Sequence, residues 1–202
     1  MQDVALDFYT GRIKFYTASL LEIDKKIRQI SYQRLLSILL FAAGVYFGIT
    51  TNSYIFLPAI IFFIFFVVFV NRHTKVFQER ILLKELLILN QKEAAFLSGD
   101  KTVFDAGLDF DPGRTGSHHL YALDLDIFGV GSLFQSINRT STQSAREHLS
   151  ALLLSPSQNE SDITLRKSAI HDLRYETEWR QKFYAIGTQV DEKPNDYLKI
   201  RE

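Results

Sequence analysis

Two glycine-containing stretches carry residue types that can hold a phosphate group. Gly129-x-Gly131 follows a run of alternating apolar residues, as the start of a dinucleotide-binding loop would, but Phe134 stands where the third glycine is required. Gly99-Asp-Lys101-Thr102 lacks the adjacent glycine and lysine of a phosphate loop, and Ala94 takes the place of the upstream glycine. We therefore predict no nucleotide site and no cofactor in this chain.

Histidine and aspartate side chains are the remaining candidates for metal binding or catalysis. Adjacent His118 and His119 would point to opposite faces of a strand, and no third ligand follows at helical spacing. Asp105, Asp109 and Asp111 do not have the spacing of a calcium loop. The absence of cysteine excludes disulfides and thiolate chemistry. We predict no metal, no catalytic residue and no small-molecule substrate.

The charges do not single out a polyanionic partner. The 23 lysine and arginine residues equal the 23 aspartate and glutamate residues in number. From Arg139 to Lys182, basic and acidic side chains are interleaved, whereas a DNA-binding face needs basic residues gathered on one surface. The sequence neither predicts nor excludes such a surface.

Two uncharged apolar runs are the strongest structural signal. They read LLSILLFAAGVYFGI over residues 35–49 and YIFLPAIIFFIFFVVFV over residues 54–70, and apolar residues occupy every side of each helix. A spanning helix needs roughly 20 residues, so flanking side chains such as Tyr32 and Arg72 would extend both runs to headgroup depth. We predict a two-helix transmembrane hairpin over residues 35–70. The alternative is a hairpin buried in a soluble core, for which the rest of the chain offers little covering surface.

The flanks of the two runs predict their orientation. Basic residues precede the first run and follow the second, whereas the link Thr50–Ser53 carries no charge. By the positive-inside rule, both long arms and both termini are expected in the cytoplasm, with the hairpin in the inner (cytoplasmic) membrane. The basic residues are Lys25, Lys26, Arg28, Arg34, Arg72 and Lys75.

Small residues in the first run predict a close helix contact. Gly44 and Gly48 lie four residues apart, the spacing at which two membrane helices approach closely. Dimerisation with another chain and packing against the second run of the same hairpin both fit this spacing. We favour packing within the hairpin.

The segments next to the apolar runs have the periodicity of helices in water. In residues 1–34, apolar side chains repeat at alternating steps of three and four, as in a coiled coil or an ordinary amphipathic helix. Residues 71–98 carry a second stripe. Because both helices adjoin a tight hairpin, we predict that they pack antiparallel as a stalk. The first set is Ile13, Tyr16, Leu20, Ile23, Ile27 and Ile30, and the second is Leu82, Leu86, Leu89 and Phe96.

The rest of the chain predicts a small, mainly helical domain. Glycines and Pro112 make residues 99–117 a loop. The alternation from Leu123 to Ile127 predicts one short strand within the domain, which covers residues 118–190. Residues 191–202 are expected to be a frayed tail. The residues expected to cap the helices of the domain are Ser132, Thr140, Thr142 and Asp162.

One block of this domain carries a specific set of motifs. They are Asp124-Leu125-Asp126, Gly131-Ser132-Leu133-Phe134, Ile137-Asn138-Arg139-Thr140-Ser141-Thr142, and then Arg146, Leu149, Ile163, Arg166, Ile170 and Leu173. Together they resemble the core, or lever, domain of the MutS-family mismatch-repair ATPases. Two membrane helices ahead of this core are similar to the arrangement in membrane-anchored MutS-like proteins of bacteria.

The resemblance also has departures. Ala145 stands where the family usually has glycine. The family's ATPase domain would lie beyond Glu202, and no mismatch-reading domain precedes the core. The resemblance therefore implies a mechanical connector without a catalytic residue, and Arg139 is the residue we expect to contact a neighbouring element.

Two functional hypotheses follow. The first is a membrane-anchored MutS-like protein related to DNA mismatch repair, of which this chain is the non-catalytic connector; a full-length relative would be an ATPase. The second is a membrane-bound scaffold or dimerisation module with no nucleic-acid role. The partners considered are the lipid bilayer, a second copy of the chain, and DNA in a full-length context.

Overall fold

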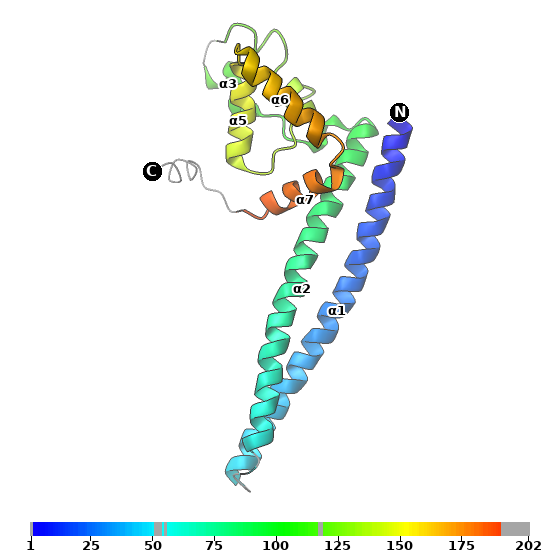
Figure 1. Cartoon of the computed structure of the whole chain (residues 1–202), viewed down its shortest axis with the longest axis vertical. Helices are drawn as coiled ribbons and strands as arrows, with labels where there is room; N and C mark the ends of the chain where they lie inside the picture. Colours follow the sequence, from blue (N-terminus) through cyan, green and yellow to red (C-terminus); the bar gives the residue numbers. More distant parts are fainter. Residues whose placement is uncertain (1, 51–53, 55, 117–118, 191–202) are drawn as a thin grey trace. The chain divides into compact units, whose positions relative to one another are not determined.

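The computed structural model describes residues 2–50, 54, 56–116 and 119–190, and within these ranges it is helical without a β-strand (Figure 1). The mainly α prediction is confirmed. Two long helices come first, followed by short helical elements. In chain order they are α1 (Gln2–Thr50), α2 (Phe56–Leu97), η2 (Lys101–Val103), η3 (Leu108–Phe110), α3 (Pro112–Thr115), α4 (Leu133–Ile137), α5 (Gln143–Leu154), α6 (Glu160–Leu173) and α7 (Thr177–Gly187).

The chain forms two compact units. Unit 1 comprises Met1–Ile13 and Glu85–Glu202, and unit 2 comprises Lys14–Lys84. The boundaries fall inside α1 and α2, not at the ends of the apolar runs, because both helices continue without a break from the apolar runs into the charged segments. The first turns of α1 therefore belong with the C-terminal half of the chain.

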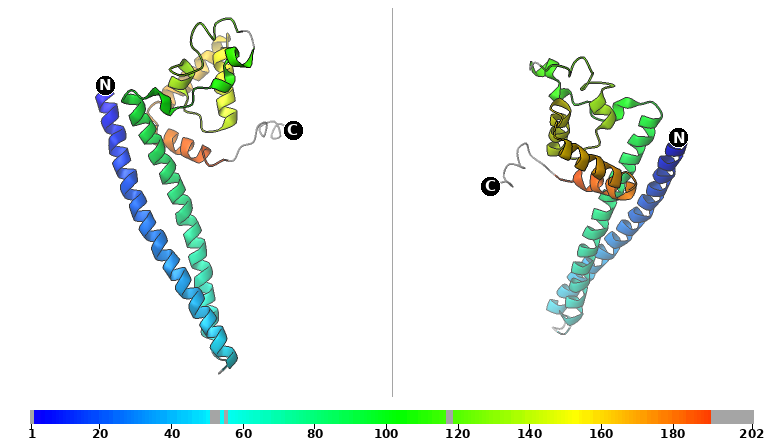
Figure 2. Two further views of the ribbon diagram at one scale, coloured as in Figure 1. Left: turned by 180° about the vertical axis from the view of Figure 1, so that it is seen from behind. Right: turned by 45° about the horizontal axis from the view of Figure 1, so that its top comes forward.

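Unit 2 is an antiparallel pair of helices, which Figure 2 shows from two further sides. Asp24 of α1 meets Arg80 of α2 at 2.6 Å, whereas Phe41, further along α1, meets Phe63, earlier in α2, with ring centroids 5.2 Å apart. Within this unit the predicted seam is buried at Tyr16, Ile23 and Ile30, and its seven-residue step continues to Ser37. The buried side chains of the seam are therefore apolar in the part of α1 near the charged segments, whereas Ser37, further along, is a small one.

The two long helices are long and apolar enough to cross a membrane. Their most apolar stretches are only 11% and 6% buried within the described chain. Side chains such as Leu39, Ile60 and Phe65 are half exposed or more. A hairpin inside a soluble core would be covered on most sides, whereas these apolar surfaces are exposed within the described chain.

Unit 1 has a core of aromatic and aliphatic side chains under its short helices. Phe134 of α4 is fully buried, and the ring of Phe128 lies 5.4 Å from it, centroid to centroid. Ala122 and Ile127 complete the buried cluster. The backbone of Gly107, at φ 64°, lies close to the Phe134 ring. A Cβ at this position would lie 2.7 Å from that ring, so only glycine fits here. This core fixes α4 and the residues that follow it.

The predicted strand from Leu123 to Ile127 is wrong, because these residues form turns. The amide of Leu125 donates to the carbonyl of Tyr121, and Asp126 takes a positive φ of 47°. Leu123 and Leu125 are largely exposed, and only Ile127 enters the core. The alternation therefore does not reflect one buried face, and without a neighbouring strand to pair with, the backbone satisfies its hydrogen bonds locally.

The segment predicted as a loop over residues 99–117 contains short helical turns. Asp100 and Asp111 accept hydrogen bonds from the amides of Thr102 and Gly113 and so start η2 and α3. Pro112 occupies the first position of α3, where its missing N–H is not needed. Aspartate and proline, which suggest a loop, here start single turns. Residue 117, the predicted tail 191–202 and residues 51–53 of the predicted link lie outside the described residues.

Candidate functional site

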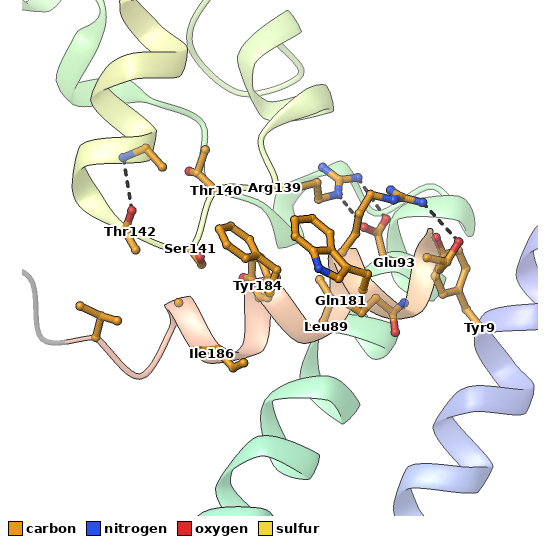
Figure 3. A pocket seen from close by; sticks show the side chains of 17 residues that line it. Tyr9, Leu89, Glu93, Arg139, Thr140, Ser141, Thr142, Gln181, Tyr184 and Ile186 are labelled. Carbon is orange, nitrogen blue, oxygen red and sulfur yellow. Dashed lines mark hydrogen bonds and ion pairs between the residues drawn. The ribbon is translucent and has the colours of Figure 1, made fainter. Parts of the chain in front are cut away.

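A cavity of unit 1 lies along α7 and has a volume of about 580 Å³ (Figure 3). We call it the α7 cavity. Its walls come from α7, from the segment Thr140–Thr142 that leads into α5, and from the parts of α1 and α2 that belong to this unit. The cavity thus lies where the motif-bearing block meets the long helices. Its lining includes Tyr9, Leu89, Glu93, Arg139, Trp179 and Phe183.

Helix α7 is joined to α2 by two buried side-chain amides. Nδ2 of Asn90 donates to Oε1 of Gln181 at 3.0 Å, and Nε2 of Gln181 donates back to Oδ1 of Asn90 at 3.0 Å. Nδ2 of Asn90 also donates to the carbonyl of Leu86. Asn90 is 0% exposed and Gln181 is 5% exposed, so loss of either partner would leave a buried polar group unsatisfied. This pair fixes the position of α7 on α2.

Arg139 connects the motif-bearing block to the same stretch of α2. Its Nε and Nη2 donate to the two carboxylate oxygens of Glu93 at 2.6 and 3.1 Å. Its guanidinium lies 3.5 Å from the centre of the Phe104 ring, and Nη1 donates to the carbonyl of Asn138. The forked ion pair and the ring contact hold the guanidinium in one geometry. Arg139, singled out in the sequence, therefore lies at a contact between elements.

Two tyrosines beside these groups have altered acidity. Burial raises the pKa of Tyr9, and the carboxylate of Glu93 raises it further. Burial also raises the pKa of Tyr184, with Glu85 adding to the effect. Both phenols are therefore held neutral, since a phenolate would lie in poorly hydrated surroundings near a carboxylate.

Arg146 is a second arginine whose charge is paired with carboxylates inside unit 1. It forms ion pairs with Asp105 at 3.2 Å and with Asp109, and its guanidinium lies 5.0 Å from the centre of the Phe110 ring. Like Arg139, it is neutralised by carboxylates of its own unit. Neither arginine presents a free charge to a phosphate, which weakens the case for a DNA-binding face built on them.

The predicted helix caps are found in part. Ser132 accepts a hydrogen bond from the Gln135 amide and caps α4, and Thr142 accepts one from the Ala145 amide and caps α5. Thr140 caps no helix; its amide and hydroxyl both donate to Oδ1 of Asn138. Helix α6 is capped by Asn159, three residues before Asp162, because α6 starts earlier than its apolar residues suggest.

Gly44 and Gly48 lie in unit 2 against the second helix of the same hairpin. A Cβ at Gly44 would lie 2.8 Å from the Cβ of Ala59, and one at Gly48 would lie 3.0 Å from the Phe56 ring. Because glycine has no side chain, the two helices can approach closely at these positions inside this chain.

Among the described residues, the phosphate candidate at Gly99–Thr102 and the metal candidates do not assemble into a site. At Gly99-Asp-Lys101-Thr102, Asp100 turns its own carboxylate onto the Thr102 amide and hydroxyl, so the backbone has no free nest for an anion. The Thr102 hydrogen bonds also lower the pKa of Asp100. Among the described residues no group of three or more metal-ligating side chains is present. His119 contacts the carbonyl of Leu154 at 2.9 Å, and His118 lies outside the described residues.

Sequence reasoning misses the Asn90–Gln181 pair and the outer face of α7. An isolated asparagine in an apolar stripe gives no sign of its partner 91 positions away. The outer face does leave a signal, since Trp179, Phe183, Ile186 and Val190 follow one another at steps of four, three and four. Such spacing is typical of a buried face, whereas all four side chains are more than half exposed.

Comparison with known proteins gives no match. No protein-family model matches this chain, and no curated protein or solved structure does so either.

Proposed function

We propose that this chain is the membrane-anchored, non-catalytic connector of a MutS-like protein. The hairpin of α1 and α2 would hold it in the inner membrane with both termini in the cytoplasm, and the motif-bearing block would pass conformational change between the membrane helices and domains beyond Glu202. Arg139 is the observation that carries the proposal: it lies in the most specific stretch of the resemblance and joins that stretch to Glu93 of α2.

The arrangement suits a connector better than an enzyme. Two pairs of polar side chains at the α7 cavity satisfy each other: Asn90 with Gln181, and Arg139 with Glu93. Such pairs stiffen the link between a short helix and a long one, so that a displacement of one moves the other.

The native reading frame tests this proposal. We expect it to continue past Glu202 into an ATPase domain with a phosphate loop. A connector needs a domain on each side, and here these would be the membrane hairpin and the ATPase domain. The chain by itself should show no heat of binding to ATP and magnesium in calorimetry. A stop codon at that place, or micromolar ATP affinity of this chain, would contradict the proposal.

DNA binding separates this function from the second candidate, a membrane-bound scaffold without a nucleic-acid role. The exposed apolar face of α7 and the internally paired arginines favour the scaffold. For the connector, the full reading frame should bind duplex DNA with a steep salt dependence, while this chain alone binds no tighter than about 10⁻⁴ M. For the scaffold, neither protein should respond to DNA.

A further inference from the structure

A long segment of unit 2 carries positive charge alone. From residue 25 to residue 78 the sequence contains six lysine and arginine residues and no aspartate or glutamate. The other 17 basic residues and all 23 acidic residues lie outside this segment, so the segment has a net charge of +6 although the whole chain has none. We call the six residues the basic belt: Lys25, Lys26, Arg28, Arg34, Arg72 and Lys75.

The antiparallel register of α1 and α2 brings the two parts of the belt to the same level. Asp24 of α1 meets Arg80 of α2, and each step forward along α1 corresponds to a step back along α2, so Arg72 lies level with Tyr32. Arg34 is half a turn away from that level. The α1 part of the belt extends over nine residue steps, about 14 Å at 1.5 Å per residue. The belt is therefore one band across both helices.

The belt side chains have no carboxylate partner. Five of them are exposed, and Arg34 is half-buried. Within the part of the chain that the structure describes, none of the six forms an ion pair. Four arginines elsewhere do have a carboxylate oxygen within 3.3 Å, and they are Arg12, Arg80, Arg139 and Arg146. The chain thus supplies carboxylates to these arginines and none to the belt.

The belt borders the apolar runs, at the depth where a bilayer carries its phosphates. Arg34 directly precedes the first run, and Arg72 follows the second after one residue. Tyr32, which is 71% exposed, is of a residue type enriched at headgroup depth. A headgroup layer of about 5–7 Å and one Debye length of about 8 Å together match the length of the belt along α1. All six charges would therefore lie within the field of an anionic leaflet.

We infer that the basic belt binds the phosphate groups of anionic phospholipids such as phosphatidylglycerol. The inference rests on the membrane hairpin of the proposed function. It goes beyond insertion, because apolar helices enter any bilayer, whereas unpaired cations distinguish lipids by charge. Clusters of about four to eight basic residues next to a membrane helix are typical of such binding, and each one near an anionic surface strengthens it about fivefold. Duplex DNA fits less well, since an anionic membrane surface repels it.

Lipid selectivity in reconstituted bilayers tests the inference. The full chain is placed in mixed phosphatidylcholine and phosphatidylglycerol bilayers, and spin-labelled lipid of either kind reports the fraction immobilised by the protein. At low salt we expect a relative association constant at least about threefold higher for phosphatidylglycerol than for phosphatidylcholine. The ratio should approach one at 1 M salt, where the Debye length is only about 3 Å.

A matched pair of triple variants locates the selectivity. The first variant neutralises half of the belt and keeps the three cations that adjoin the apolar runs and orient the hairpin; it carries Lys25→Gln, Lys26→Gln and Arg28→Gln. The control neutralises three exposed cations outside the segment, and it carries Lys101→Gln, Arg166→Gln and Lys167→Gln. We expect the belt variant to lose at least about half of the selectivity and the control to keep it.

The outcomes separate this inference from the proposed anchor. Equal immobilisation of the two lipids at low salt would overturn the inference and leave the hairpin intact, because immobilised lipid of either kind reports inserted helices. Absence of any immobilised lipid would contradict the hairpin as well. Equal selectivity of the two triple variants, or displacement of phosphatidylglycerol by duplex DNA at physiological salt, would also overturn the inference.

Discussion

Asn90 of α2 and Gln181 of α7 exchange two hydrogen bonds of 3.0 Å inside unit 1, across 91 positions of sequence. Both side chains are almost completely buried. A reciprocal pair of amides satisfies one donor and one acceptor on each residue, so it is stable in a place where a single amide would be destabilising. The helix that leaves the apolar hairpin is thereby connected to the last helix of the described chain.

The losses of stability on removal of the two amides should not be additive. We expect Asn90→Ala to lower the free energy of unfolding by about 1–3 kcal/mol, because Gln181 is left buried without a partner. Replacement of both residues by leucine should cost clearly less than the sum of the single substitutions. Urea unfolding in mild detergent, followed by the fluorescence of Trp179, the one tryptophan of the chain, measures both effects. Additive losses would mean that the amides do not act as a pair.

Arg139 should be sensitive even to a conservative change. We expect Arg139→Lys to lose about 1–2 kcal/mol of stability, because lysine cannot form the fork to Glu93 or cover the Phe104 ring with a planar group. Arg166→Lys on the exposed helix α6 is the control and should change stability by less than about 0.5 kcal/mol. Equal stability of the two variants in the same unfolding experiment would show that the Glu93 contact contributes nothing.

Part of this architecture follows from sequence and part does not. The uncharged runs and the seam at Tyr16, Ile23 and Ile30 predict the long helices, because an apolar pattern that keeps its period over many turns is characteristic of a helix. The alternation from Leu123 to Ile127 is misleading, since five residues are too few to separate a strand from a series of turns. Pairing of Asn90 with Gln181 depends on tertiary geometry and leaves no local pattern.

The raised pKa of Tyr9 predicts a loss of stability at alkaline pH. A phenol whose pKa is higher in the folded chain than its usual 10.0 stabilises the fold fully below pH 10, and this contribution disappears as the pH rises through the folded value. We expect Tyr9→Phe to weaken the alkaline destabilisation of unit 1 and to reduce the late-titrating portion of the tyrosinate absorbance, to which Tyr184 also contributes. Tyr175→Phe, at an exposed position, is the control. An unchanged titration in Tyr9→Phe would contradict the burial of this phenol.

Close approach of α1 and α2 at Gly44 predicts that a large residue there separates the helices. The Phe41 and Phe63 rings lie 5.2 Å apart, so in a Phe41→Cys, Phe63→Cys chain a short bifunctional thiol reagent should cross-link the two helices in membranes. Gly44→Leu should abolish that cross-link, because its side chain would overlap Ala59. Gly11→Leu, with open space around it, should not. Cross-linking that persists in Gly44→Leu would place the hairpin contact elsewhere.

The membrane hairpin is the central claim, and cysteine accessibility in sealed membranes tests it most directly. Single cysteines at Asn52, in the link between the apolar runs, and at Lys101, after α2, should react with a membrane-impermeant reagent from opposite sides. Lys101→Cys should be labelled only from the cytoplasmic side and Asn52→Cys only from the other. Labelling of both positions from the same side in intact cells would contradict the hairpin and, with it, the proposed anchor.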